Sequence, residues 1–140
     1  MDFCNNFTPE DIAGRDGFSS YNHITVTDFP DGGAVGELAV SAQSLNPHGI
    51  VHGGCLASLA DTVAGWAVAH ATGRDCVTVN YCFNFLRPAK GTNQKIVCRA
   101  TPEKLGRTLC VYKVNLSDDA GETVATGDFT FFLMGPMEDL

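Results

Sequence analysis

The apolar run at residues 54–72, GCLASLADTVAGWAVAHAT, constrains the fold of this chain more than any other stretch. It is rich in Ala, lacks the period-two alternation of a strand, and is followed by Gly73, a residue typical of helix C-caps. A helix that is apolar on nearly every side lies either in a core or in a membrane. The run is short for a membrane span, and a carboxylate at its middle costs roughly 2.5–3.5 kcal/mol on insertion scales. We therefore predict a fully enclosed helix of a soluble domain, and no membrane span.

The remaining segments have the residue pattern of β-strands. Residues 22–29 and 34–40 flank the turn sequence Pro30-Asp31-Gly32-Gly33 and predict a hairpin. Four more strands are predicted after the helix, at 77–86, 94–101, 108–117 and 123–133. In the first of these, the odd positions from Val77 to Phe85 are apolar, while Thr78 and Asn80 face the other way. Because the connections are short, we expect antiparallel neighbours and an α+β fold, with a long helix wrapped by an antiparallel sheet of about six strands in one domain, residues 1–140.

The charge of the chain narrows the kinds of partner. Nine Lys and Arg against sixteen Asp and Glu give a formal net charge of −7. This balance argues against nucleic-acid binding, which depends on Lys and Arg, although a local basic patch can still hold a small anionic ligand. The N-terminal sequence MDFCNNFTPEDIAG has no basic segment followed by an apolar run, so we expect no signal peptide and a cytoplasmic location.

The six cysteines give no sign of a metal site. They stand at positions 4, 55, 76, 82, 98 and 110 and form no C-x-x-C pair, so a metal knuckle is not expected. Their spacing alone leaves disulfides open. Reduced, buried thiols are the simpler interpretation for a cytosolic protein.

Asp61 is the one acidic or basic residue, histidine aside, between Gly54 and Thr72. The positions three and four residues away hold only Ala, Ser and Gly, so no cation on the same helix can pair with it. A buried carboxylate without a partner is costly, and chains tolerate one where the group has work to do. The structural alternative is that Asp61 faces a solvated edge or meets a basic residue from another element.

A glycine-rich segment, Asn46-Pro47-His48-Gly49-Ile50-Val51-His52-Gly53-Gly54, immediately precedes the helix. Gly53 and Gly54 allow close backbone approach to a ligand, and the free N–H groups of a first helical turn favour negative charge, as in an oxyanion hole. Eight residues at a rise of 1.5 Å separate Gly53 from Asp61 by about 12 Å, so one helix cannot bring both to the same carbonyl. If both act on one bond, they come from different subunits, which predicts a symmetric homodimer with two shared sites.

The pattern N-P-x-G-x-x-H-G-G-x-x-x-x-L-A-D over residues 46–61, followed by N-F-L-R-P-A at 84–89, resembles the hotdog-fold acyl-CoA thioesterases. Within them it is most similar to the phenylacetic-acid-degradation thioesterase family, and the resemblance covers roughly residues 20–133. It implies a long helix wrapped in an antiparallel sheet, in agreement with the fold predicted above. It also implies an acyl-CoA substrate and an assembly of two dimers.

The resemblance implies roles for five positions. Asp61 matches the family's catalytic carboxylate, as nucleophile or general base, and Gly53 matches the N–H that polarises the thioester carbonyl. Asn46 matches the residue that helps to hold the carbonyl or the water, and His52 matches one that assists the thiolate or positions water. Thr78 falls where relatives have a Ser or Thr that orients the nucleophile. Such a set cleaves a thioester without a metal or other cofactor.

The acyl group implied is aromatic, such as phenylacetyl or hydroxybenzoyl, or a chain of medium length. Coenzyme A carries phosphate charges, so basic residues should gather at one mouth of the site. The candidates are Arg87, Lys90, Lys104 and Arg107, each of which is as well explained alone by a solvated hairpin charge. His48 is interpreted as a loop histidine, and His70 as a structural residue whose positive charge suits the helix C-terminus.

Two other functions share such a scaffold. A non-catalytic acyl-CoA-binding or sensing module does not need a buried carboxylate, so the presence of Asp61 favours catalysis. Hydration or dehydration of an enoyl thioester uses a different His-plus-acid arrangement, and the sequence has no matching motif.

Overall fold

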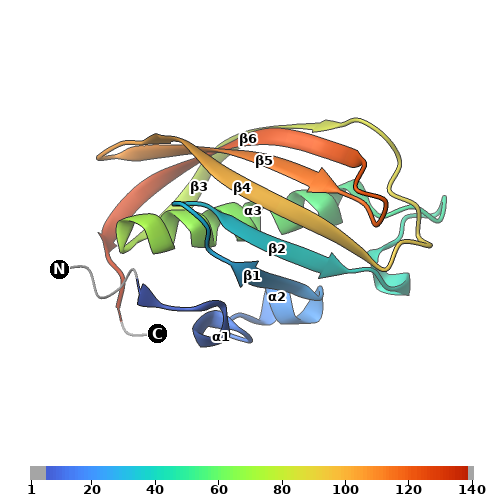
Figure 1. Ribbon diagram of the computed structural model, residues 1–140, viewed down its shortest axis with the longest axis horizontal. Coiled ribbons are helices and arrows are strands. Elements are labelled where there is room, and N and C mark those ends of the chain that lie inside the picture. The colour runs from blue at the N-terminus through green and yellow to red at the C-terminus, as the bar shows by residue number, and fades with distance from the viewer. Residues whose placement is uncertain (1–5, 139–140) are drawn as a thin grey trace.

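One antiparallel sheet of six strands curves around a long helix in the computed structural model, which describes residues 6–138 (Figure 1). The order of strands across the sheet is β1-β2-β4-β5-β6-β3. The strands are β1 (Ile24–Asp28), β2 (Ala34–Ala39), β3 (Arg74–Phe85), β4 (Lys95–Leu105), β5 (Leu109–Ser117) and β6 (Thr123–Pro136). All of their pairings are antiparallel, so the predicted α+β architecture is confirmed.

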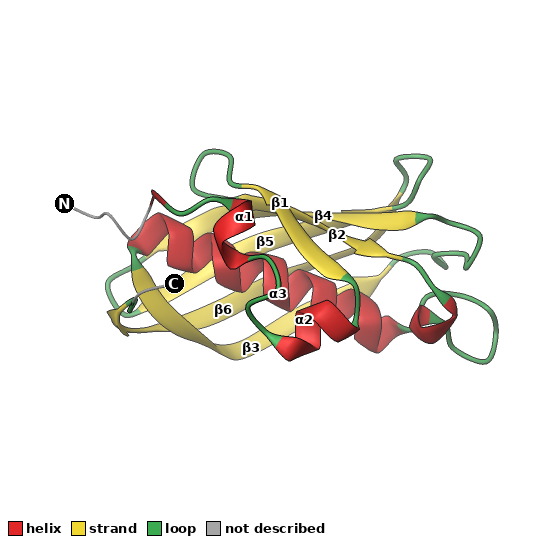
Figure 2. Cartoon of the chain, turned by 90° about the horizontal axis from the view of Figure 1, so that it is seen from below, coloured by secondary structure: helices red, strands yellow, loops and turns green. Residues whose placement is uncertain are grey.

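The central helix α3 (Gly53–Thr72) lies against one face of the sheet and contacts every strand (Figure 2). Gly73 ends it with φ +70°, a left-handed conformation that glycine adopts without the steric cost of a Cβ. Its buried side is small and apolar: Leu56, Leu59, Ala60, Val63, Ala64, Ala67, Val68 and Ala69. The other side, which includes Asp61 and Trp66, is half-buried. The prediction of a fully enclosed helix is therefore wrong for a single chain, because the sheet covers only one side of it.

Short helices cover part of the open side of α3. These are α1 (Pro9–Ile12) and α2 (Gly17–Tyr21), and Figure 2 shows both in front of α3. A one-turn helix, η2 (Ala42–Ser44), precedes the loop that leads into α3. The sequence patterns did not predict α2, although Asp16 is a good N-cap whose Oδ1 accepts the Ser19 N–H at 2.7 Å.

β3 and β4 are consecutive in the chain but are not neighbours in the sheet. β3 pairs with β6 at the sheet edge, whereas β4 lies between β2 and β5. The connection 86–94 pairs instead with the loop before α3, where the Val51 N–H donates to Ala89 O at 2.8 Å. The expectation of antiparallel neighbours is therefore wrong for this connection, because its backbone groups find partners outside the sheet.

A register shift in β3 between Thr78 and Asn80 changes which side chains face the helix. Directly opposed residues of an antiparallel pair lie on the same face of the sheet. Thr78 is opposite Phe131 before the shift, Tyr81 is opposite Phe129 after it, and both phenylalanines are buried. Thr78 and Tyr81 therefore share the helix-facing side. The predicted single alternation over 77–86 is wrong, because one extra residue shifts the period of two.

The five cysteines of the described chain are free thiols. Cys98 and Cys110 are buried, Cys55 and Cys76 are half-buried and Cys82 is exposed, while Cys4 lies outside residues 6–138. Within that range, no three His, Cys, Asp or Glu residues are placed to hold a metal ion. The same range contains no helix that is long and apolar enough to cross a membrane.

Candidate active site

Asp61 lies half-buried at the middle of α3 and is hydrogen-bonded to β3. The Thr78 Oγ1 hydroxyl donates to Asp61 Oδ1 at 2.6 Å, the short distance of a charge-assisted bond. No ion pair of the described chain reaches this carboxylate. The expected buried and unpaired acid is therefore a half-buried acid with a neutral donor. Its other oxygen, Oδ2, has no donor among residues 6–138.

A pocket of about 510 Å³ opens beside Asp61 and Thr78. Its walls come from α2, from the open side of α3, from the start of β3 and from the end of the described chain. The charged and larger side chains that line it are Asp16, Phe18, Asp61, Trp66, Asp75, Val77, Phe131, Met137 and Glu138. The carboxylate thus adjoins a space that can hold a small organic group.

The first turn of α3 has unused hydrogen-bond donors. His52 is the N-cap, and its Nδ1 accepts the Gly54 N–H at 2.8 Å. An accepting Nδ1 carries no proton, so the neutral imidazole has its N–H at Nε2. The Gly53 N–H has no acceptor within the helix, and the described part of the chain supplies none. Gly53 and His52 therefore each leave one N–H for a ligand.

Asn46 organises the loop ahead of this turn. Its Oδ1 accepts the N–H groups of His48 at 2.9 Å and Ile50 at 3.3 Å, which leaves its amide NH₂ as a donor. The loop reverses at Gly49, which has φ +77°. Asn46 and Gly53 line a second pocket, of about 350 Å³.

Within one chain, the predicted catalytic residues form two half-sites. Asp61 and Thr78 line the pocket at the middle of α3, and Asn46 and Gly53 line the pocket at its N-terminus. No residue lines both pockets. This separation agrees with the helical rise, which places Gly53 and Asp61 about 12 Å apart along the axis.

Phe85 is a residue of the second half-site that the sequence patterns did not identify. A Cβ placed on Gly53 would lie only 3.1 Å from the Phe85 ring. The ring therefore packs on the first turn of α3, and a side chain at position 53 would have to displace it by a few tenths of an ångström. In the sequence, Phe85 is one of several phenylalanines in predicted strands, and nothing there distinguishes it from a core residue. In the structure its side chain is 58% exposed.

The four basic residues expected to bind coenzyme A do not gather in one chain. Arg87 and Lys90 follow β3 and lie near the first turn of α3, whereas Lys104 and Arg107 lie in the β4–β5 hairpin at the other end of α3 (Figure 1). Arg74, the residue after the α3 C-cap, donates from Nη1 to Arg107 O at 2.9 Å, which places Arg107 at the C-terminal end of α3. A helix of 20 residues separates the two pairs by roughly 30 Å.

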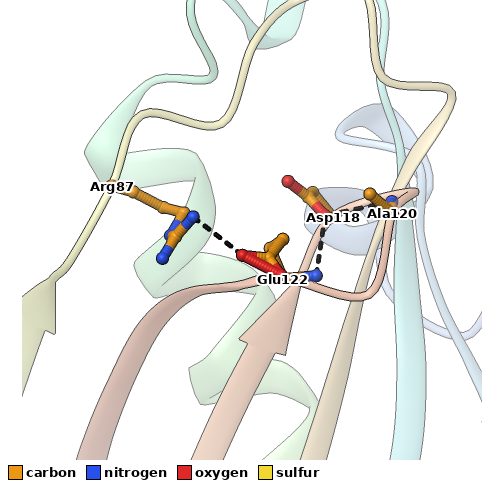
Figure 3. A network of polar contacts seen from close by, with 4 residues as sticks. All are labelled: Arg87, Asp118, Ala120 and Glu122. Carbon is orange, nitrogen blue, oxygen red and sulfur yellow. Dashed lines mark hydrogen bonds and ion pairs between the residues drawn. The ribbon is translucent and has the colours of Figure 1, made fainter.

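Arg87 forms an ion pair with Glu122 of the β5–β6 turn (Figure 3). Arg87 Nη1 donates to Glu122 Oε1 at 2.9 Å, and both side chains are more than half exposed. The turn is fixed by Asp118 Oδ1, which accepts the N–H groups of Ala120 at 3.0 Å and Glu122 at 2.9 Å. Exposed ion pairs contribute about 0–1 kcal/mol, so a bound anion can compete for Arg87.

His70, in the last turn of α3, belongs to an aromatic cluster. Its ring stacks on Phe29 with centroids 4.1 Å apart, and Phe7 contacts it edge-on at 4.9 Å. Burial lowers the pKa of His70. The lowered pKa favours the neutral imidazole, and the ring contacts agree with the structural role predicted for His70. His48 is exposed in its loop, as expected.

The family model of the thioesterase superfamily matches residues 48–125, more than half of the chain. The match includes His52, Gly53, Asp61 and Thr78. This chain belongs to the thioesterase superfamily. Its resemblance to the family of the PaaI thioesterase is confirmed, and as a member it is a thioester hydrolase.

Two relatives of this thioesterase are named as acyl-coenzyme A thioesterases. It is 32% identical over 102 residues to acyl-coenzyme A thioesterase PaaI of Escherichia coli, covering 73% of this chain and 71% of that protein. It is 31% identical over 109 residues to human acyl-coenzyme A thioesterase 13, covering 76% and 77%.

Solved structures support the same placement. The E. coli PaaI protein, from the phenylacetic acid degradation operon, superposes with a TM-score of 0.87 at 26% identity, covering 98% of each chain. A hypothetical thioesterase of Streptococcus pneumoniae, crystallised with coenzyme A, gives a TM-score of 0.77 at 30% identity, covering 84% of this chain and 94% of that one. The predicted hotdog fold is thus confirmed.

Proposed function

We propose that this thioesterase hydrolyses acyl-coenzyme A at a site shared by two subunits. The main support is the position of the Asp61 carboxylate, which accepts a hydrogen bond of 2.6 Å from Thr78 and adjoins a pocket of about 510 Å³. The names of the E. coli and human relatives support acyl-coenzyme A as the substrate class. Coenzyme A in the crystal of the S. pneumoniae thioesterase supports the same ligand.

The second half-site supplies the donors that Asp61 lacks nearby. In the proposed complex, the thioester carbonyl oxygen accepts from the Gly53 N–H of a second subunit. The Asn46 amide holds the carbonyl or the attacking water, and the His52 Nε2–H donates to the leaving sulfur. Backbone donors fixed before the reaction stabilise the developing oxyanion without reorganisation.

Hydrolysis by this set starts at Asp61 and breaks the C–S bond. As a general base, Asp61 takes a proton from water as the water oxygen bonds to the carbonyl carbon. Collapse of the tetrahedral intermediate leaves the C–S electron pair on sulfur, and the proton returns to give the thiol and the carboxylic acid. As a nucleophile, Asp61 bonds to the carbonyl carbon itself and the C–S bond breaks, with its electron pair leaving on the thiolate of coenzyme A. Water then cleaves the resulting anhydride to the carboxylic acid and free Asp61, and one of the protons of water goes to the thiolate. Single turnover in H₂¹⁸O tests the second route, because attack of water on the Asp61 carbonyl of the anhydride places ¹⁸O in the Asp61 carboxylate, whereas general-base attack labels only the product acid.

The edge of the sheet offers a surface for the second subunit. β3 is an edge strand, and Val77, Val79 and Tyr81 along it are each at least half exposed. An apolar edge strand of this length favours pairing with another copy. A two-fold axis beside β3 would generate two equal sites, and a dimer of dimers is the assembly we propose from the family resemblance.

In the proposed complex, the cations available to coenzyme A lie at the Gly53 half-site. Arg87 lines that pocket and Lys90 lies three residues further along the connection, so we propose these two for the phosphates. Lys104 and Arg107 could join them only from another subunit. The acyl group would then occupy the pocket of Asp61, where Phe18, Trp66 and Phe131 favour an aromatic group or a chain of medium length.

Thiol release from phenylacetyl-, hydroxybenzoyl- and fatty acyl-CoA tests the proposal. Asp61→Asn keeps the shape of the side chain and removes its charge, so kcat should fall by about 10²–10⁴-fold. Asp128→Asn, on β6 and outside both pockets, is the matched control and should leave kcat unchanged. Full turnover by the Asp61 variant would contradict the proposal. Tight acyl-CoA binding by a wild-type protein that cleaves nothing would favour a sensing module.

A further inference from the structure

The pocket beside Asp61 is lined by acidic side chains and by no basic ones. Of the described residues that line it, Asp16, Asp61, Asp75 and Glu138 are acidic, and none is Lys, Arg or His. The proposed hydrolysis uses only Asp61. The other three acids therefore give this pocket a charge for which the chemistry has no need.

No cation of the described chain neutralises these three acids. The ion pairs within residues 6–138 involve Glu37, Glu103, Glu122 and Asp128, all outside this pocket. Asp16 is fixed in place, because its Oδ1 accepts the Ser19 N–H at 2.7 Å and caps α2. The capping bond therefore holds the Asp16 carboxylate at the pocket wall.

The pKa of the Cys76 thiol, which lines the same pocket, is affected by this negative charge. The pKa of Cys76 is raised to about 12, mainly by burial and in smaller part by the charges of Cys110, Asp61 and Asp75. A second anion placed near this thiol would meet the same repulsion.

The opposite half-site has the opposite polarity. Arg87 lines the pocket of Gly53, and Lys90 follows in the same connection. In a site assembled from both halves, the phosphates of coenzyme A lie toward these cations. The acyl group then enters the pocket that Phe18 and Trp66 line together with the acids.

We propose that this pocket accepts uncharged acyl groups and rejects acyl groups that end in a carboxylate, with Asp16, Asp75 and Glu138 as specificity-determining residues. The inference rests on the proposed function and deepens it. A terminal carboxylate would lose water and gain only like charges, whereas an apolar end would contact aromatic rings. Discrimination therefore comes from repulsion of the wrong substrate as much as from contacts with the right one.

Matched pairs of acyl-CoA substrates test the inference. Hexanoyl-CoA and adipoyl-CoA have six-carbon acyl chains and differ in the terminal carboxylate, and 6-hydroxyhexanoyl-CoA controls for polarity without charge. We expect kcat/KM for hexanoyl-CoA to exceed that for adipoyl-CoA by about 30-fold or more, with the hydroxy compound close to hexanoyl-CoA. Raising the salt concentration should reduce the ratio, because exposed charges are screened.

Two triple variants locate the source of the ratio. Asp16→Asn with Asp75→Asn and Glu138→Gln should lower it at least about fivefold, by improving turnover of adipoyl-CoA. Glu37→Gln with Glu103→Gln and Asp128→Asn removes three charges outside the pocket and should leave the ratio unchanged. Because both substrates are measured on one preparation, partial loss of folded protein cancels from the ratio.

The outcomes separate this inference from the proposed function. Efficient cleavage of both hexanoyl- and adipoyl-CoA would overturn the inference and leave the hydrolase intact. A ratio that persists in the pocket variant, or a hydroxy compound as poor as adipoyl-CoA, would also overturn it. Failure to cleave any uncharged acyl-CoA would overturn the proposed function, and the inference with it.

Discussion

Thr78 and Asp61 are 17 residues apart in the chain and are joined by a hydrogen bond of 2.6 Å from Oγ1 to Oδ1. The bond connects the edge strand β3 to the open side of α3. It fixes one carboxylate oxygen and leaves the other unused among residues 6–138. We expect the orientation of Asp61, and with it the rate of hydrolysis, to depend on this one hydroxyl.

Thr78→Val tests the orienting bond, because valine keeps the shape of threonine without its hydroxyl. A hydrogen bond to a charged group contributes about 1.5–3 kcal/mol, so kcat should fall by roughly 10–100-fold. Thr78→Ser keeps the donor and should retain most of the activity. Added to Asp61→Asn, Thr78→Val should cost little more, since the two residues act as a pair. Full additivity in this double-mutant cycle would contradict the orienting role.

Gly53→Pro tests the backbone donor, because proline has no N–H. Proline is tolerated at the first helical position, and His52 has ψ 134°, a conformation that suits the residue before proline. We expect kcat to fall by about 10²–10³-fold, as when one oxyanion donor is removed. Gly53→Ala brings the same Cβ toward Phe85 but keeps the N–H, so it should retain more activity. Equal losses in the two variants would assign the effect to the Phe85 contact.

His70 makes the stability of the fold depend on pH. Burial lowers the pKa of His70 from its ordinary 6.5, so between 6.5 and the lowered value the unfolded chain binds more protons than the folded one. The free energy of unfolding should therefore fall as the pH is reduced from about 7 toward 5. His70→Phe keeps a ring against Phe29 and should weaken this dependence. Urea titrations at both pH values measure it, and an identical loss in the two proteins would refute the role of His70.

Cys76 should be an unreactive thiol. With a pKa of about 12, roughly one Cys76 side chain in 10⁴ is ionised at pH 8. Alkylation by iodoacetamide, followed by peptide mass spectrometry, should therefore be slower in the folded protein than in the guanidinium-unfolded chain by orders of magnitude. Similar rates in both states would show that the thiol is neither buried nor surrounded by negative charge.

Helix α3 and the strands could be predicted from the sequence because their composition, alternation and flanking turn residues are properties of short segments. Ala-rich composition ending at Gly73 marked α3, and alternation between turns marked the strands. The bulge beside Val79 was missed because an inserted residue leaves both halves of β3 alternating, and only the pairing with β6 shows the change of phase. The crossover at 86–94 was missed because its partners are in the loop before α3, far away in the sequence.

The part of the candidate site that lies on a single helix, α3, could be predicted from the sequence. Residue spacing alone showed that no cation on the helix can pair with Asp61. It also gave the distance along the helix axis between Gly53 and Asp61. The contact of Phe85 with Gly53 and the wall formed by α2 depend on tertiary packing, so no periodicity reveals them. The separation of Arg87 from Lys104 depends on strand order, which the sequence patterns assigned wrongly at that connection.

Subunit complementation tests the shared site most directly. Asp61→Asn and Gly53→Pro, each strongly impaired alone, are co-expressed with different affinity tags, and the assemblies that carry both tags are purified. If the site takes Asp61 from one subunit and Gly53 from the other, each heterodimer has one intact site and should show about half of the wild-type kcat per dimer. If both groups act within one chain, every site is broken and the purified heterodimer stays as inactive as the two parent variants.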